Sequence, residues 1–271
     1  MTKRLSLLLA LLLALGPARP AAAWPSSIME QLARDARRLL PKSLAMLMYQ
    51  HEKEIIEEAQ RFPPDLAQLM AADLASGKLQ PETLAALQQH AQGAVDLLKE
   101  KKVSAGIVQL GALLRIPADL ADPVITAGEP GYPSGVTREY YSFVEQSLPK
   151  IPVVLDDAAA LRLRRDGLSS YWLRLHGRSR GDAPVILLEM FRNGRVVDHR
   201  TLDYRSPVFG VASLSYSRAV TAIAATWLVL WREARGDLTR RPVPLEVRPS
   251  EAPVLSASPA SPSPHPEGSK P

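Results

Sequence analysis

The chain contains no cysteine, which excludes both disulfide bonds and thiolate metal sites. It has no Gly-x-Ser-x-Gly nucleophile elbow, no glycine-rich phosphate loop and no P-loop lysine. It also has no sustained run of lysine and arginine with interleaved aromatic residues, so nothing indicates a nucleic-acid partner. Histidine is scarce, and no pair among the five has convincing zinc spacing: His51, His90, His176, His199 and His265.

Residues 1–23 have the pattern of a secretory signal peptide. Lys3 and Arg4 precede an apolar stretch of about 11 residues, which is shorter than the roughly 20 needed to span a bilayer, and Ala21-Ala22-Ala23 is typical of a cleavage site. We therefore expect a bacterial protein exported to the periplasm or secreted, with Trp24 as its first mature residue and no transmembrane span after cleavage. A retained N-terminal anchor is the alternative. Loss of the signal would lower the formal net charge from +5 to +2, because it removes three basic residues and no acid.

The rest of the chain divides into two parts. Residues 24–241 are long enough for one domain with a sizeable core. Residues 242–271 contain nine of the 24 prolines together with serine and alanine, so this tail is expected to be disordered.

Hydrophobic periodicity predicts an all-α, multi-helix domain. Helices are expected near 26–40, 43–61, 81–98, 103–121 and 140–148, with a short one from Asp65. The segment 183–205 fits either a β-hairpin turning at Asn193-Gly194 or a helix capped by Asp182 and Gly194, and we favour the helix. A last helix should begin at Ser215 or Ser217 and end at Gly236. Its apolar run suits a core helix better than a membrane span.

The segment Leu110–Ile125 follows the pattern of a metal-binding helix, Leu-Gly-x-x-x-His-x-x-x-Asp-x-x-x-Pro-x-His, but lacks both histidines. Arg115 and Ile125 stand at the histidine positions. Because Arg115 and Asp119 are one helical turn apart, we predict a salt bridge between them in place of a metal. Pro117 should kink the helix between these two residues and weaken that pairing.

Taken together, these segments resemble the superfamily of zinc-dependent phospholipase C and single-strand-specific zinc nucleases. The resemblance covers nearly the whole predicted domain, and these features carry it: Trp24 at the mature N-terminus, Met29–Pro41, Leu110–Pro123, Tyr132–Gly135 with Tyr140–Glu145, and Phe209–Ser217 with the helix that follows.

The resemblance implies a trinuclear zinc site, yet this chain departs from it at most ligand positions. The histidine of the first helix falls near Met29, the metal-helix pair at Arg115 and Ile125, the next histidine at Thr137 and the following glutamate at Tyr141. Trp24, Asp119 and Asp65 remain as vestigial ligand positions. Two carboxylates and a terminus are too few donors for three zinc ions, so we expect no metal, no cofactor and no catalytic residue.

Other candidate sites are weaker. His51 and Glu54 could share a ligand face, but a solvated, charged helix surface is favoured, and the same holds for His90. Asp156-Asp157 is better explained as a helix N-cap before Ala158 than as a catalytic pair. One basic cluster could meet anionic lipid headgroups or phosphate, although a solvated face is the favoured explanation: Arg162, Arg164, Arg165, Arg174, Arg178 and Arg180.

Three hypotheses about function follow. The leading one is an exported, catalytically inactive member of this superfamily that acts as a binding or envelope-associated module, with a cleft lined by Trp24, Arg115, Asp119, Thr137 and Tyr141. The second is a zinc-dependent phosphoester hydrolase with a reduced or rearranged metal site. The third is a structural module that docks through its C-terminal tail.

Overall fold

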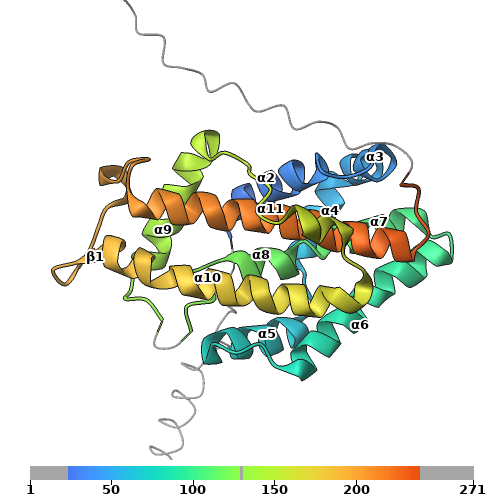
Figure 1. Cartoon of the computed structure of the whole chain (residues 1–271), viewed down its shortest axis with the longest axis horizontal. Helices are drawn as coiled ribbons and strands as arrows, with labels where there is room; N and C mark the ends of the chain where they lie inside the picture. The colour runs from blue at the N-terminus through green and yellow to red at the C-terminus, as the bar shows by residue number, and fades with distance from the viewer. Residues whose placement is uncertain (1–23, 129–130, 239–271) are drawn as a thin grey trace, which may run out of the picture.

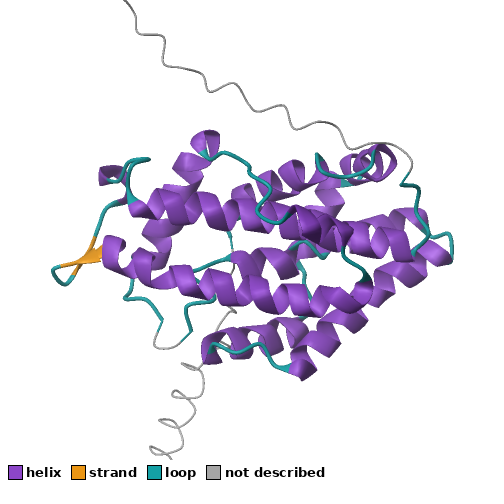
Figure 2. Ribbon diagram, in the orientation of Figure 1, coloured by secondary structure: helices purple, strands orange, loops and turns teal. Residues whose placement is uncertain are grey.

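The computed structural model describes residues 24–128 and 131–238, and this part of the chain is mostly helical, as predicted (Figures 1 and 2). The expected signal peptide and the Pro/Ser-rich tail lie outside the described residues. Two short strands form the one described sheet, β1 (Phe191–Arg192) and β2 (Arg195–Val196), paired antiparallel.

Prolines mark the beginnings of most helices in the first half of the domain. The helices are α2 (Ser26–Arg37), α3 (Lys42–Gln50), α4 (Glu52–Gln60), α5 (Pro64–Ser76) and α6 (Pro81–Lys99). Pro25, Pro41 and Pro63 are N-caps, and Pro64 and Pro81 occupy the first turn, where the missing N–H costs no helical hydrogen bond. The single helix predicted over 43–61 is wrong, because the chain breaks at His51 between α3 and α4.

The predicted metal-helix segment is also divided, into α7 (Val103–Ala112) and α8 (Arg115–Ala121). Pro117 explains the break, since a proline inside a helix removes one amide donor and its ring collides with the carbonyl four residues earlier, here that of Leu113. The amide of Ile116 instead donates to the Leu113 oxygen in a tighter turn. Our prediction therefore placed the kink one turn too late: it precedes Arg115.

The uncertain segment 183–205 contains a helix and a hairpin. α10 runs from Leu168 to Met190, so Asp182 lies in its interior and is not an N-cap. The hairpin β1–β2 follows directly and turns at Asn193-Gly194, both of which have positive φ (51° and 73°), the backbone that such a tight turn requires. Gly194 is thus a turn residue and not a helix cap.

The last helix, α11 (Pro207–Glu233), is longer than predicted. Ser206 caps it by accepting a hydrogen bond from the Phe209 amide, whereas Ser215 and Ser217 are buried in its interior, so the predicted caps are wrong. At the other end, Arg235 adopts a positive φ of 59° and the Gly236 amide donates to the Trp231 carbonyl at 2.8 Å. This is a Schellman-type ending in which Gly236 has the outer position.

α11 is the central element of the domain. Figure 1 shows α10 beside it along the length of the molecule, α8 contacts both, and α2 and α6 also pack on α11. The segments Val103–Ala121 and Pro207–Glu233 are long and apolar enough to cross a membrane, but 67% and 72% of their apolar windows are buried inside the fold. Because core helices meet the same criteria, length and composition are weak evidence for a span here.

The remaining elements are α9 (Val136–Ser147) and four short 3-10 helices: η1 (Leu148–Lys150), η2 (Ala158–Arg162), η3 (Arg165–Gly167) and η4 (His199–Thr201). Asp157 caps η2 by accepting from the amides of Ala159 and Ala160, which confirms the N-cap prediction. Its neighbour Asp156 instead binds Arg178 at 2.9 Å.

Candidate functional site

The salt bridge predicted on α8 is present. Nε of Arg115 lies 2.7 Å from Oδ2 of Asp119, and the side chains are 17% and 4% exposed. The break before Arg115 leaves both residues on one regular helical turn, so Pro117 does not disrupt their pairing. Arg115, at one of the two positions where the sequence pattern has a histidine, therefore binds Asp119 directly.

Asp119 is only half satisfied by this contact. Its second oxygen, Oδ1, is buried and has no hydrogen-bond partner among the residues that the structure describes. Burial raises the pKa of Asp119 to about 6, although the charge and hydrogen bond of Arg115 act in the opposite direction. A buried acceptor without a donor is energetically unfavourable, so Oδ1 of Asp119 is the atom of α8 that most needs a further partner.

Asp122 lies directly after α8 and is fully buried. Its Oδ2 accepts a hydrogen bond from the Tyr141 hydroxyl at 2.7 Å, and its Oδ1 accepts one from the Val124 amide at 2.8 Å. Burial, together with the nearby charge of Asp119, raises the pKa of Asp122 to about 7, although the hydrogen bond from Tyr141 acts in the opposite direction. Sequence reasoning missed this residue, although its place three residues after Asp119 and immediately before Pro123 could have drawn attention to it.

Trp24 connects the start of the domain to this pair of carboxylates. Its indole Nε1 donates to the Ala118 carbonyl at 3.0 Å, 94 residues away in sequence. Its ring packs on those of Tyr141 and Tyr140, with centroid distances of 5.8 and 6.3 Å. Only 3% of the residue is exposed. We call Trp24, Arg115, Asp119, Asp122 and Tyr141 the α8 cluster.

The other sequence-predicted positions are dispersed. Thr137 and Asp65 are exposed in the first turns of α9 and α5, and Met29 is buried in α2. Ile125 instead lines a small depression beside Arg115 and Asp119, whose remaining walls are apolar: Phe62, Ala67, Met70, Ala71 and Leu74. The structure therefore brings Arg115 and Asp119 to this depression, while Thr137, Trp24 and Tyr141 are not among its lining residues.

The described histidines occupy different environments. His51 separates α3 from α4, and His90 is half-buried with its ring edge-on to Phe62 at 5.5 Å, so it is less exposed than expected. His176 is 5% exposed in α10, and burial together with Arg180 lowers its pKa. His265 lies outside the described residues.

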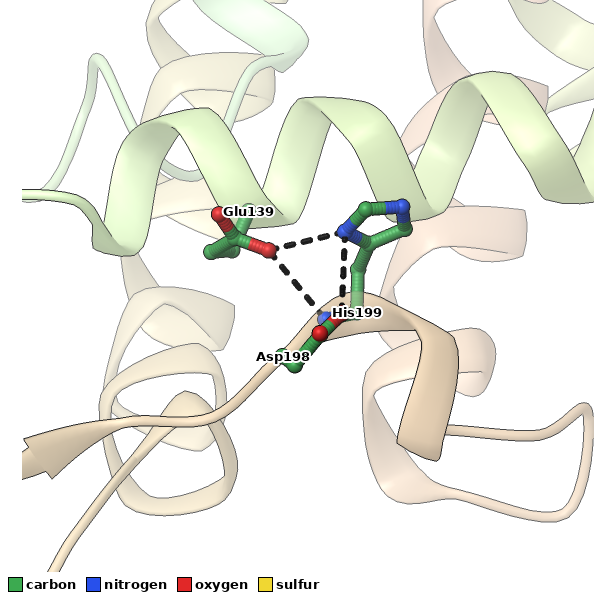
Figure 3. A group of neighbouring side chains, drawn as sticks. All are labelled: Glu139, Asp198 and His199. Carbon is green, nitrogen blue, oxygen red and sulfur yellow. Dashed lines mark hydrogen bonds and ion pairs between the residues drawn. The ribbon is translucent and has the colours of Figure 1, made fainter.

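One further group has the composition of a metal site. Ligand atoms of Glu139, Asp198 and His199 all lie within 4.8 Å of one another, as Figure 3 shows. Sequence reasoning missed it because Glu139 is in α9, 60 residues before His199. These side chains already have protein partners: Nδ1 of His199 lies 2.8 Å from Oε2 of Glu139, and the Arg200 amide donates to Asp198. The hydrogen bonds of the His199 ring and amide to Glu139 hold the pKa of that carboxyl near 2 and link η4 to α9.

The basic cluster is largely engaged within the protein. Arg165 pairs with Glu233 at 2.7 Å, Arg178 pairs with Asp156, and Arg180 donates to the Gly77 carbonyl. Arg174 lies over the Tyr171 ring, 5.8 Å from its centroid. Four of the six cations therefore have partners within the protein, and carboxylates neutralise two of them, Arg165 and Arg178.

Comparison with known proteins gives no match: neither a protein-family model, nor a curated protein, nor a solved structure matches this chain.

Proposed function

We propose that this protein is an exported, non-catalytic binding or envelope-associated module of the zinc phospholipase C/nuclease type, in which an internal ion pair has replaced the metal centre. The observation that supports this proposal is the 2.7 Å contact between Arg115 and Asp119. A fixed guanidinium at that distance from the carboxylate would repel a divalent cation bound to it.

The residues present do not fit a trinuclear zinc site. Ile125 offers no donor, and Thr137 and Asp65 are exposed in separate helices. Tyr141 donates its hydroxyl hydrogen to Asp122 and would have to lose that proton to bind a metal, while burial raises its pKa well above the ordinary value. These positions therefore do not supply the ligands that zinc-dependent hydrolysis of the trinuclear kind requires.

A second candidate function, a phosphoester hydrolase with a reduced metal site, has one observation in its favour. Asp119 and Asp122 are two buried carboxylates in one cluster, and Oδ1 of Asp119 is unpartnered among the described residues. A single small cation would satisfy that oxygen, although it would have to do so beside Arg115.

Metal analysis of the purified mature protein separates the two candidates. The non-catalytic proposal predicts less than about 0.1 zinc per chain after dialysis against micromolar zinc. It also predicts no hydrolysis of bis(p-nitrophenyl) phosphate or phosphatidylcholine above a blank. Stoichiometric zinc with hydrolysis that a chelator abolishes would overturn it.

The binding role is tested with a defined probe. Vesicles of phosphatidylglycerol should bind the protein, and a chelator should leave that binding unchanged. Equal binding to phosphatidylcholine vesicles would exclude recognition of an anionic headgroup.

A further inference from the structure

Trp24 has an unusual position for a residue at the start of a domain. The first residues of a domain are commonly exposed and poorly ordered. Here the Trp24 indole is buried, hydrogen-bonded to the Ala118 carbonyl and packed on Tyr140 and Tyr141. Since the indole is held at the carbonyl that immediately precedes Asp119, the main-chain nitrogen of Trp24 is confined to within one side-chain length of α8.

Among the described residues, the same region contains two buried carboxyl groups and only one cation, Arg115. Arg115 binds Asp119 through Oδ2 only, and Oδ1 of that carboxylate is left buried without a donor among the described residues. Asp122 adds a second buried carboxylate, whose partners are the uncharged Tyr141 hydroxyl and Val124 amide. Buried carboxylates without a compensating cation destabilise a fold strongly.

The expected cleavage site lies directly before Trp24 and provides a source for that cation. We propose that removal of the signal peptide creates an α-ammonium group on Trp24 that pairs with Oδ1 of Asp119 and thereby completes the α8 cluster. In this step a signal peptidase adds one water across the Ala23–Trp24 peptide bond. Ala23 leaves with a carboxylate, and the new amine of Trp24 takes up a proton at neutral pH.

The chemistry of the site favours an ammonium over a metal ion. A monovalent –NH3⁺ group has three donors and is delivered covalently, so it needs no further protein ligands. It can occupy the free side of Asp119 while Arg115 keeps the other. The inference rests on the export proposed above, because without cleavage the Trp24 nitrogen is an uncharged amide.

The test compares two N-termini in a double-mutant cycle. One preparation begins at Trp24, and the other carries a single extra alanine, which moves the ammonium away by about 3.8 Å. We expect the form that begins at Trp24 to melt at least about 5 °C higher. In the Asp119→Asn background this difference should fall below about 1 °C. The substitution also leaves Arg115 without its partner, but that cost is the same with and without the extra alanine and cancels in the comparison.

Asp73→Asn is the matched control. Asp73 is also buried, but its carboxylate accepts a hydrogen bond from the Gln80 amide at 2.7 Å. The N-terminal difference in melting temperature should persist in this variant. Equal melting temperatures of the two wild-type forms, or a difference that survives Asp119→Asn unchanged, would overturn the proposal.

Two further measurements separate this inference from the proposed function. An NMR-monitored titration should give a Trp24 α-amino pKa clearly above the ordinary value of about 8, and an ordinary value would contradict the ion pair. N-terminal sequencing of the exported protein should begin at Trp24. A different start would overturn the inference while leaving the metal and vesicle results to decide the function.

Discussion

The Tyr141 hydroxyl donates a 2.7 Å hydrogen bond to Oδ2 of Asp122, linking α9 to the end of α8. The resemblance places a metal-binding glutamate at the position of Tyr141. A phenol at that position supplies a donor instead of another negative charge, so a buried carboxylate is satisfied without a cation. On Asp119 the partner is instead a cation, because Arg115 binds Oδ2 and leaves Oδ1 without a donor among the described residues.

Tyr141→Phe should lower the free energy of unfolding by about 1–3 kcal/mol, because Oδ2 of Asp122 loses its donor inside the protein. Urea unfolding followed by circular dichroism measures the change. Tyr49→Phe is the control, since Tyr49 is 65% exposed and its change should be within about 0.5 kcal/mol of zero. Equal effects of the two substitutions would show that the buried hydrogen bond contributes nothing.

In protein extended before Trp24, where no ammonium forms at that residue, Arg115→Met should cost about 3 kcal/mol by leaving the Asp119 carboxylate buried without its cation. The double variant Arg115→Met/Asp119→Leu should recover most of that loss, because it removes both charges and fills the space with apolar atoms. Chemical denaturation of the two single variants and the double variant gives the coupling energy. Additive losses would argue against a direct interaction.

In protein whose chain is extended before Trp24, no ammonium forms at that residue. The pH dependence of its stability should then be set largely by the carboxyl groups of Asp119 and Asp122. The pKa values of Asp119 and Asp122 are raised from 3.8 to about 6 and about 7, so these groups bind protons more tightly in the folded state. Stability should therefore decrease as the pH rises from about 4 to 7 and level off above that. For Asp122 alone the loss is up to about 4 kcal/mol.

Glu139 acts in the opposite direction at lower pH. The pKa of Glu139 is lowered from 4.5 to about 2. Its stabilising contribution is therefore present above pH 4.5 and is lost as the pH falls towards 2. The combined contribution of these three carboxylates should be greatest near pH 4–5, while the lowered pKa of His176 acts against the decline between pH 4 and 7, so thermal melts of the wild type and Asp122→Asn are compared between pH 3 and 8. Asp122→Asn should flatten the decline between pH 4 and 7, and an unchanged slope in that variant would contradict the assignment.

Gly236→Ala should destabilise the end of α11 by about 1–3 kcal/mol. A Cβ at Gly236 would lie 2.0 Å from Cε2 of the Trp231 indole, so the indole or the turn must shift. Gly210→Ala is the matched control on the same helix, because a Cβ there meets nothing within 4 Å and should stabilise by about 0.5–1 kcal/mol. Thermal unfolding of both variants checks the sign of each change.

Contacts within one element could be predicted from the sequence because helix geometry sets them. The 3.6-residue repeat indicated the helices, and the i,i+4 spacing of Arg115 and Asp119 predicted their salt bridge. Asp157 could be identified as a cap because its bonds go to amides two and three residues away.

Helix boundaries inside the core depended on packing. α10 continues through Asp182, whose carboxylate pairs there with Arg218 of α11, and α11 extends back to Ser206, so that Ser215 and Ser217 are enclosed by neighbouring elements. The local patterns at Asp182 and at these serines resemble caps. Contacts with other helices decided instead that these residues lie inside α10 and α11.

The sequence by itself determined that the chain is mostly helical and that Arg115 and Asp119 form a pair on one helical turn. Tertiary structure alone decided that Trp24 reaches Ala118, that Tyr141 reaches Asp122 and that Glu139 reaches His199. These pairs are 94, 19 and 60 residues apart. The physical reason is that hydrogen bonding within one helix depends on spacing along the chain, whereas contacts between elements depend on how their apolar faces exclude water together.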